Sequence, residues 1–447
     1  MVEVSFFKLH FSNADKQTLK IALPLILSNI TIPLVGLVDN AVMGHLGSPI
    51  YIGAVSIGAI IISYILFSFG FFKSVTTGIT SQYIGSNNER LLLKSLYQIL
   101  LISSFVSIVI LLFRDTIIFY ALDIFNGTNE VKANSAIYIS YRIWSVPAIF
   151  LRDIMIGYYI GTQKSKTAMT ISILINLINI FLDYYLVIVM GYGIEGVAIA
   201  SVIAEYSILF FVIYAQFKEK ILSKFNINLG EIIDWKSLKQ KILINFDFFI
   251  RSLILMTCFA YFVSTGARHG DIILAANAIL LNFFFIFSYG LDGFAHASEA
   301  LVGNAIGKKD TVLTTKSIFS TGKFSLILTL VYLAAFLIFD EAIISLITNL
   351  ELVQIAANHF SFWLYLIFIF GGIAFWLDGV FIGALKNKLL RDTMIISGLI
   401  FFLFESMFGN LANLGLWMAF LSFFIARSLL LGSVLIWQLK KNKFLIS

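Results

Sequence analysis

The chain has 447 residues, of which 59% are hydrophobic and 13% are charged, and its mean hydropathy is +0.94. Soluble domains are typically about 45–50% apolar and about 25% charged, so this composition predicts an integral membrane protein without a large soluble domain. The net charge of +6 reflects Lys and Arg gathered on one membrane side, so no nucleic-acid partner is expected. The one cysteine, Cys258, excludes an internal disulfide framework and a Cys-based metal site.

Twelve apolar stretches follow one another along the chain, and a bilayer crossing takes about 20 helical residues. They lie near 18–43, 51–80, 95–120, 135–160, 168–190, 194–216, 242–265, 273–302, 317–339, 354–383, 394–408 and 415–438. The stretch 394–408 is short for a crossing. The sequence therefore predicts an all-α polytopic membrane protein with twelve transmembrane helices.

The Lys and Arg residues alternate from one inter-span loop to the next. Most of the 31 lie in the terminal segments and in every second loop, whereas the opposite loops hold only Arg114, Lys132 and Arg268. Positive loops are retained in the cytoplasm, so both termini are expected there. The start of the chain lacks the apolar core and cleavage site of a signal peptide and is interpreted as a lead-in to the first span.

A polar, Lys-rich linker divides the chain at its middle. We expect a six-helix N-terminal lobe at 1–220, a cytoplasmic linker at 221–241 and a six-helix C-terminal lobe at 242–447. "GYYIGTQKSK" at 157–166 aligns with "GVFIGALKNK" at 379–388, an offset of 222 that also aligns Gly85 with Gly307. An even number of spans per half indicates a parallel repeat with a pseudo-twofold along the membrane normal. Such repeats build secondary transporters around a cavity between the lobes.

Polar residues inside the spans fall into groups that share a helix face. These groups are Asn176, Asn179 and Asp183, then Ser201 and Glu205, then Asp292, His296 and Glu299. Intramembrane charges usually face the bundle interior, because exposure to lipid costs several kcal/mol. Asp247 and Arg251 are spaced i, i+4 and are expected to form an ion pair.

The stretch "NITIPLVGLVDNAVMGHLG" at 29–47 places Asp39 in the first span. One interpretation is an aspartate at the outer helix end, because Asp39 lies about 28 Å beyond Lys20 at about 1.5 Å per residue. The other is a buried carboxylate that carries a proton. Pro24 and Pro33 each remove a backbone hydrogen bond and can bend the span, or form a static kink.

Nucleotide-binding and zinc-protease motifs give no functional signal here. "GYGIEG" at 191–196 fits G-x-G-x-x-G but lies in a short turn between spans, not in a βαβ unit. No G-x-x-x-x-G-K-[ST] occurs, so ATP is not expected to drive transport. The histidines include no H-E-x-x-H, and no cofactor or metal site is expected.

Four segments together resemble the MATE (multidrug and toxic compound extrusion) family, and specifically its DinF-like branch. They read "LPLILSNITIPLVGLVDNAVMGHLGS", "FGFFKSVTTGITSQYIG", "NLINIFLDYYLV" with "GYGIEGVAIASVIAEY", and "AANAILLNFFFIFSYGLDGFAHASEALVGNAIG". The resemblance implies two six-helix lobes and the export of lipophilic, often cationic compounds in exchange for protons, with Na+ as the alternative coupling ion.

The resemblance also implies residue roles. It assigns cation coupling to Asp39, Asn179 and Asp183, and substrate contact or gating to Pro24, Ser201, Asn277, Asp292 and Asp378. Arg152 departs from the family, which often has a neutral Asn there. A cation at this position could pair with Asp39, Asp183 or Asp153, and would then disfavour a cationic substrate.

The expected function is a monomeric antiporter in a bacterial inner membrane, with Asp39 as the protonation site. The nearest alternative is a flippase for lipids or lipid-linked oligosaccharides, which a strongly cationic centre would favour. A membrane-embedded enzyme is not expected, because no intramembrane catalytic motif occurs. A passive channel would not need two bending lobes.

Overall fold

The computed structural model describes residues 12–44, 49–124, 128–219 and 227–441. Those residues form helices and short connections, with no strand among them. In chain order the elements are α1 (Asn13–Gly44), α2 (Pro49–Phe69), α3 (Phe71–Gly85), α4 (Glu89–Leu112), α5 (Arg114–Ile124), α6 (Asn129–Arg142), η1 (Ile143–Ser145), α7 (Val146–Gly161), α8 (Ser165–Asp183), η2 (Tyr184–Val189), α9 (Ile194–Tyr206), α10 (Ile208–Glu219), α11 (Leu229–Ile232), α12 (Trp235–Arg268), α13 (Asp271–Gly307), α14 (Thr311–Ile347), α15 (Glu351–Gly383), α16 (Asn387–Phe408), η3 (Gly409–Leu411) and α17 (Asn413–Lys440).

Eleven helical segments of the described chain are long and apolar enough to cross a membrane. α1, several of whose side chains lie outside the described part, is a further helix of 32 residues with apolar sequence. The all-α membrane fold is thereby confirmed. The stretch that looked short for a crossing, 394–408, belongs to α16, which begins earlier, at Asn387.

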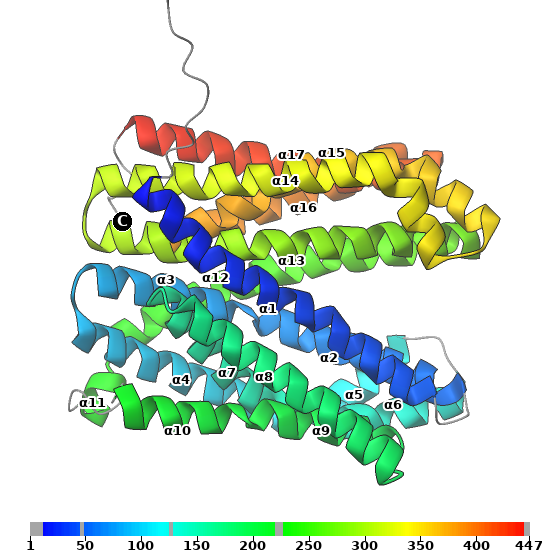
Figure 1. Cartoon of the computed structure of the whole chain (residues 1–447), viewed down its shortest axis with the longest axis horizontal. Helices are drawn as coiled ribbons and strands as arrows, with labels where there is room; N and C mark the ends of the chain where they lie inside the picture. Colours follow the sequence, from blue (N-terminus) through cyan, green and yellow to red (C-terminus); the bar gives the residue numbers. More distant parts are fainter. Residues whose placement is uncertain (1–11, 45–48, 125–127, 220–226, 442–447) are drawn as a thin grey trace, which may run out of the picture.

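The helices form two groups, with α2–α10 in one and α12–α17 in the other (Figure 1). α1 runs obliquely between the groups and contacts α13 as extensively as α8. We call the groups the N-lobe and the C-lobe, and we call the side that carries Gly85, Gly307 and the end of α17 the Lys-rich end. α12 begins at Trp235, inside the range predicted as linker.

The seam between the lobes is formed by α3 and α13, and it has twofold character. A Cβ added to Gly85 would lie 3.1 Å from the Cα of Asn304, and one added to Gly307 would lie 3.0 Å from the Cα of Gln82. Positions 82 and 304 are related by the same offset of 222 as positions 85 and 307. The two repeats therefore touch each other through equivalent residues, and only glycine permits so close an approach.

Helix ends follow the same repeat. Asn88 caps α4 by accepting a hydrogen bond from the backbone N–H of Leu91, and Asp310 caps α14 by accepting one from Leu313. Asn87, one residue earlier, has a φ of 53°, and its equivalent Lys309 has 56°. The backbone conformation and the capping contact are thus the same at the equivalent positions of the two repeats, 87 with 309 and 88 with 310.

α1 joins the lobes at the Lys-rich end. The Asp15 carboxylate accepts a hydrogen bond from Ser320 of α14 at 2.7 Å and pairs with Lys323 at 2.6 Å, and the Thr18 and Ser320 hydroxyls lie 3.0 Å apart. Burial alone would raise the pKa of Asp15, but Lys323, Ser320 and Ser12 lower it to about 2. We call this contact the α1 latch.

Candidate functional site

Asp39 and Asp183 meet in the N-lobe, where α1 lies against α8. Their carboxyl groups are within hydrogen-bonding reach of each other. Asp183 is completely buried, and no other described donor reaches either of its oxygens. η2, a turn of π-helix, begins directly after Asp183. Such turns are rare and occur frequently at functional sites.

A close contact between two carboxyl groups is favourable only when one of them carries a proton. An ionised carboxylate only accepts hydrogen bonds, so two ionised groups cannot bond to each other. One shared proton turns the contact into an O–H···O⁻ hydrogen bond, which is short and strong. The site can therefore hold or release one proton, and its release would leave two negative charges facing each other.

The other polar residues on this face of α8 bind neighbouring helices. Asn179 donates a hydrogen bond to the Ser201 hydroxyl of α9 at 3.2 Å, and Asn176 donates one to the Thr31 hydroxyl of α1 at 2.6 Å. The three residues predicted to share a face thus contact α1 or α9. α8 therefore connects α1, which carries Asp39, to α9.

Pro24 lies within α1, and α1 is a continuous helix through both of its prolines. Because proline has no N–H, Pro24 leaves the carbonyl of Lys20 without its helical partner. The Ser165 hydroxyl, at the start of α8, donates a hydrogen bond to this carbonyl at 3.1 Å. The carbonyl group that Pro24 leaves free therefore links α1 to α8, nearer to the Lys-rich end than the carboxyl pair.

Arg142 is the cation that acts on the carboxyl pair, which the sequence did not reveal. Its guanidinium attracts both Asp39 and Asp183, and it contacts the buried Tyr138 and Ser145 hydroxyls. Arg142 lies at the end of α6, and its spacing along that helix gives no link to α1 or α8.

Arg152 does not pair with Asp39 or Asp183. Its guanidinium binds the carboxylate of Glu205 at 2.5 Å and that of the adjacent Asp153 at 3.2 Å. Of the three partners considered from the sequence, only Asp153 is found, together with Glu205. Arg152 is thus held by two carboxylates of its own, and Asp39 is left to Asp183 and Arg142.

The expected pair of Asp247 and Arg251 is wrong. Asp247 binds Arg391 of α16 at 2.5 Å, and Arg251 binds Asp378 of α15 at 2.5 Å. Residues four apart on a helix are neighbours, but in α12 each of these side chains finds a closer partner on another helix.

The three polar residues predicted for the C-lobe occupy separate surroundings. Asn277 exchanges hydrogen bonds with Asn413 of α17, at 2.7 and 3.1 Å, and accepts one from Trp417. Asp378 is paired with two arginines, Arg251 and Arg427. The two side chains are bound to different partners, and they do not come together in one site.

Asp292 lies at the seam between the lobes, in the electrostatic field of Lys73 from α3 and of His296. His296 pairs with Glu299 at 3.1 Å, and the Ser74 hydroxyl of α3 donates a hydrogen bond to Glu299 at 3.1 Å. The polar face predicted on this helix is therefore directed at the other lobe.

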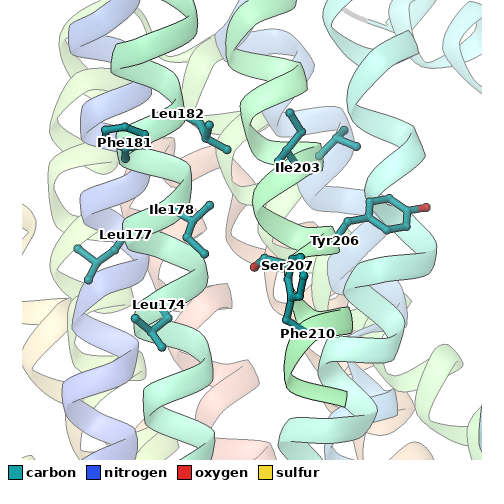
Figure 2. A pocket seen from close by; sticks show the side chains of 10 residues that line it. Leu174, Leu177, Ile178, Phe181, Leu182, Ile203, Tyr206, Ser207 and Phe210 are labelled. Atoms are coloured by element: carbon teal, nitrogen blue, oxygen red, sulfur yellow. The ribbon is translucent and has the colours of Figure 1, made fainter. Parts of the chain in front are cut away.

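An apolar groove of about 780 Å³ lies between α8 and the α9–α10 pair (Figure 2). It is lined by Leu174, Leu177, Ile178, Phe181, Leu182, Val202, Ile203, Tyr206, Ser207 and Phe210. On α8 these positions are opposite to the face of Asn179 and Asp183. The groove is thus separate from the carboxyl pair. Among the described residues, no three His, Cys, Asp or Glu side chains come together as metal ligands.

Comparison with known proteins shows similarity over both halves. A family model described as MatE matches residues 24–185 and 248–411. The chain is 35% identical over 426 residues to DNA damage-inducible protein F of Escherichia coli (strain K12), covering 95% of this chain and 92% of that protein.

Two solved structures share the fold. A MOP superfamily transporter from Pyrococcus furiosus Vc1 superposes with a TM-score of 0.86 at 16% identity, over 98% of both chains. A multidrug resistance MATE family transporter in an outward-facing conformation gives a TM-score of 0.85 at 16% identity, over 98% of this chain and 97% of that one.

Proposed function

Because this chain belongs to the MatE family of multidrug and toxin extrusion transporters, we propose that it is a secondary antiporter that exports lipophilic compounds in exchange for inward-moving protons. The observation that supports the proposal is the proximity of Asp39 to Asp183, because two carboxyl groups in contact are stabilised by a shared proton. The N-terminal lobe is assigned to 1–220 and the C-terminal lobe to the chain from Trp235, where α12 begins, in a bacterial inner membrane with both termini in the cytoplasm.

The shared proton couples the ion to the position of α1. With the proton bound, the hydrogen bond holds α1 against α8. Without it, the two carboxylates repel each other, and Arg142 offsets this repulsion in part, so the helices separate. Pro24 and Pro33 are the places where α1 lacks a backbone hydrogen bond and can bend. Substrate release follows from this movement, while Asn179, on the same face of α8 as Asp183, holds α8 to Ser201 of α9.

Proton coupling is tested by transport. Purified protein in liposomes is given an imposed pH gradient, or an Na+ gradient in a parallel set, and uptake of the cation ethidium and of the anion naphthalene-2-sulfonate is followed separately. Asp39→Asn and Asp183→Asn should insert normally and lose the pH-driven component. Asp247→Asn, an intramembrane carboxylate paired with Arg391, is the matched control and should retain it. Undiminished pH-driven flux in Asp39→Asn contradicts the assignment.

The proton itself is tested without any substrate. Infrared spectra of the wild-type protein should contain the carbonyl band of a protonated, buried carboxylic acid. That band should be lost in both Asp39→Asn and Asp183→Asn, and kept in Asp247→Asn. A band that persists in both single variants would mean that the proton belongs to another group.

A further inference from the structure

Two arginines of the C-lobe share one carboxylate oxygen. The Nη2 atoms of Arg251 and Arg427 each lie 2.5 Å from the same Oδ2 of Asp378. Two guanidinium groups therefore face a single negative charge. Arg427 is only 1% exposed and Asp378 5% exposed, so solvent does little to offset the excess. A buried charge without a partner is costly, which makes the second arginine unusual as a purely structural element.

Several donors of these arginines have no acceptor within the described chain. The Nε and Nη1 atoms of Arg427 and the Nε atom of Arg251 are buried without a hydrogen-bond partner. Buried N–H groups almost always find partners, so these three donors leave hydrogen-bonding capacity that the described chain does not use. Only groups with several acceptor oxygens match such donors, and guanidinium groups bind carboxylate, sulfonate and phosphate with two parallel bonds.

The surroundings of the arginines are aromatic. The guanidinium carbon of Arg427 lies 5.4 Å from the ring centre of Phe423 and 5.7 Å from those of Phe375 and Phe424, and Arg251 lies 5.9 Å from Phe248. These rings stabilise the cations and supply apolar walls beside them. A site with charged donors and aromatic walls fits an amphipathic anion.

The corresponding N-lobe position has the opposite charge. Arg427 is related to Glu205 by the repeat offset of 222. Glu205 and Asp153 share the one guanidinium of Arg152, and the Oε2 atom of Glu205 is unpartnered. Each lobe thus has a buried cluster of three charges, with a negative excess in the N-lobe and a positive excess in the C-lobe. The positive excess is not a by-product of the fold, because the repeat places a carboxylate there in the other lobe.

Two carboxylates at the seam, Asp292 and Glu299, adjoin this cluster, and the charge of Asp378 acts on Asp292. Asp292 faces Lys73 and His296, and Glu299 is bound by His296 and the Ser74 hydroxyl. The side chain of Arg251 remains 15% exposed and that of Arg427 1%, so Arg251 is the more accessible of the two arginines.

We propose that Arg251 and Arg427 bind the anionic head group of an amphipathic substrate, a carboxylate, sulfonate or phosphate, in place of the cationic class that the family resemblance implies. This inference rests on the proposed export of lipophilic compounds, and it specifies that the part of the compound bound in the C-lobe is negatively charged. The ligand takes the unpartnered donors, and Asp378 holds the two arginines in position when the site is empty.

The proposal is tested by binding to the full-length protein in nanodiscs of phosphatidylcholine. Naphthalene-2-sulfonate and 2-naphthyltrimethylammonium have the same ring and opposite charges, so equilibrium dialysis of the two separates charge recognition from apolar partition. The sulfonate should bind at least about tenfold more tightly. Equal affinities for the two compounds would overturn the proposal.

Three variants locate the site. Arg427→Met and Arg251→Met should each weaken sulfonate binding about tenfold or more, and the more exposed Arg251 is the safer change if Arg427→Met does not fold. Asp378→Asn removes the carboxylate that competes for the two arginines and should tighten the binding of the sulfonate. Arg391→Met is the matched control, since Arg391 also contacts two carboxylates, those of Asp247 and Asp392. Unchanged sulfonate affinity in both Arg251→Met and Arg427→Met contradicts the assignment.

The source of the anion is distinguished by adding phosphatidylglycerol to the nanodiscs, with Arg427→Met in the same discs as the reference. Competition that depends on Arg427 assigns the site to a lipid head group, as the flippase alternative requires. Its absence assigns the site to a free amphipath. Failure of all sulfonate binding overturns the anion site while leaving the infrared band and the Asp39-dependent flux to test the proton site separately.

Discussion

The seam glycines set how closely the lobes meet at the Lys-rich end, and Gly307→Ala should force them apart. The new Cβ would lie 3.0 Å from the Cα of Gln82 and 2.9 Å from its carbonyl carbon, with the carbonyl oxygen closer still. Carbon atoms are at their optimum about 3.5–4.0 Å apart, so the carbon contacts alone require the seam to widen by roughly 0.5–1 Å, and the carbonyl oxygen requires more. The obstructing atoms are backbone and cannot rotate away.

Overpacking of this kind typically costs about 1–3 kcal/mol, which corresponds to a roughly five- to 150-fold change in an equilibrium. The cost falls only on the state in which the seam is closed, so the population should shift toward a state open at the Lys-rich end. Gly85→Ala should do the same, because its Cβ would lie 3.1 Å from the Cα of Asn304.

The assay is a distance measurement between spin labels at Lys166→Cys and Lys388→Cys. Both positions are exposed, they are related by the repeat offset, and the native Cys258 is buried. Gly307→Ala should increase the fraction of molecules with a long label separation. Gly371→Ala is the control, since its nearest neighbour, a Phe424 atom, is 3.6 Å away within the same lobe. Identical distance distributions for Gly307→Ala and Gly371→Ala would refute the reasoning.

Three further predictions concern polar contacts. Asp15→Asn should weaken the α1 latch: because the folded-state pKa of Asp15, about 2, is below its ordinary 3.8, the stability that the carboxylate adds is present above about pH 4 and lost as the pH falls toward 2. The unfolding temperatures of wild type and Asp15→Asn should therefore differ at pH 6 and converge near pH 2. A double-mutant cycle of Asp247→Asn with Arg391→Gln should give a coupling of about 0.5–3 kcal/mol in thermal unfolding, whereas Asp247→Asn with Arg251→Gln should be additive. Asn413→Leu removes both amide hydrogen bonds between Asn277 and Asn413 and should destabilise the C-lobe by about 1–3 kcal/mol. The loss is measured by thermal unfolding in detergent, and an unchanged unfolding temperature would mean that water replaces the Asn413 amide.

Features that depend on pattern along the chain could be predicted from the sequence. The apolar stretches predicted helices that the structure contains, and the offset of 222 that aligned Gly85 with Gly307 reappears in their contacts across the seam. Spacing along α8 placed Asn179 and Asp183 on a common face, because helical periodicity is a local property.

Partners on other helices could not be predicted in this way. Arg142 lies on α6, and nothing in the sequence indicates that it reaches a carboxyl pair on α1 and α8. Asp247 and Arg251 are ideal neighbours by spacing, yet tertiary packing gives each a partner from a different helix. The double arginine at Asp378 depends on three helices, α12, α15 and α17, whose relative rotation no local pattern specifies.

The contact of Gly85 with residue 304, and of Gly307 with residue 82, has the form of an isologous interface, in which residue i of one copy touches j of the other and j touches i. In a homodimer such a surface appears twice on separate chains. Here both copies are covalently joined, so each can diverge without losing its partner. That freedom is what allows one position of the repeat to be Glu205 in the first copy and Arg427 in the second, a difference that two identical subunits could never have.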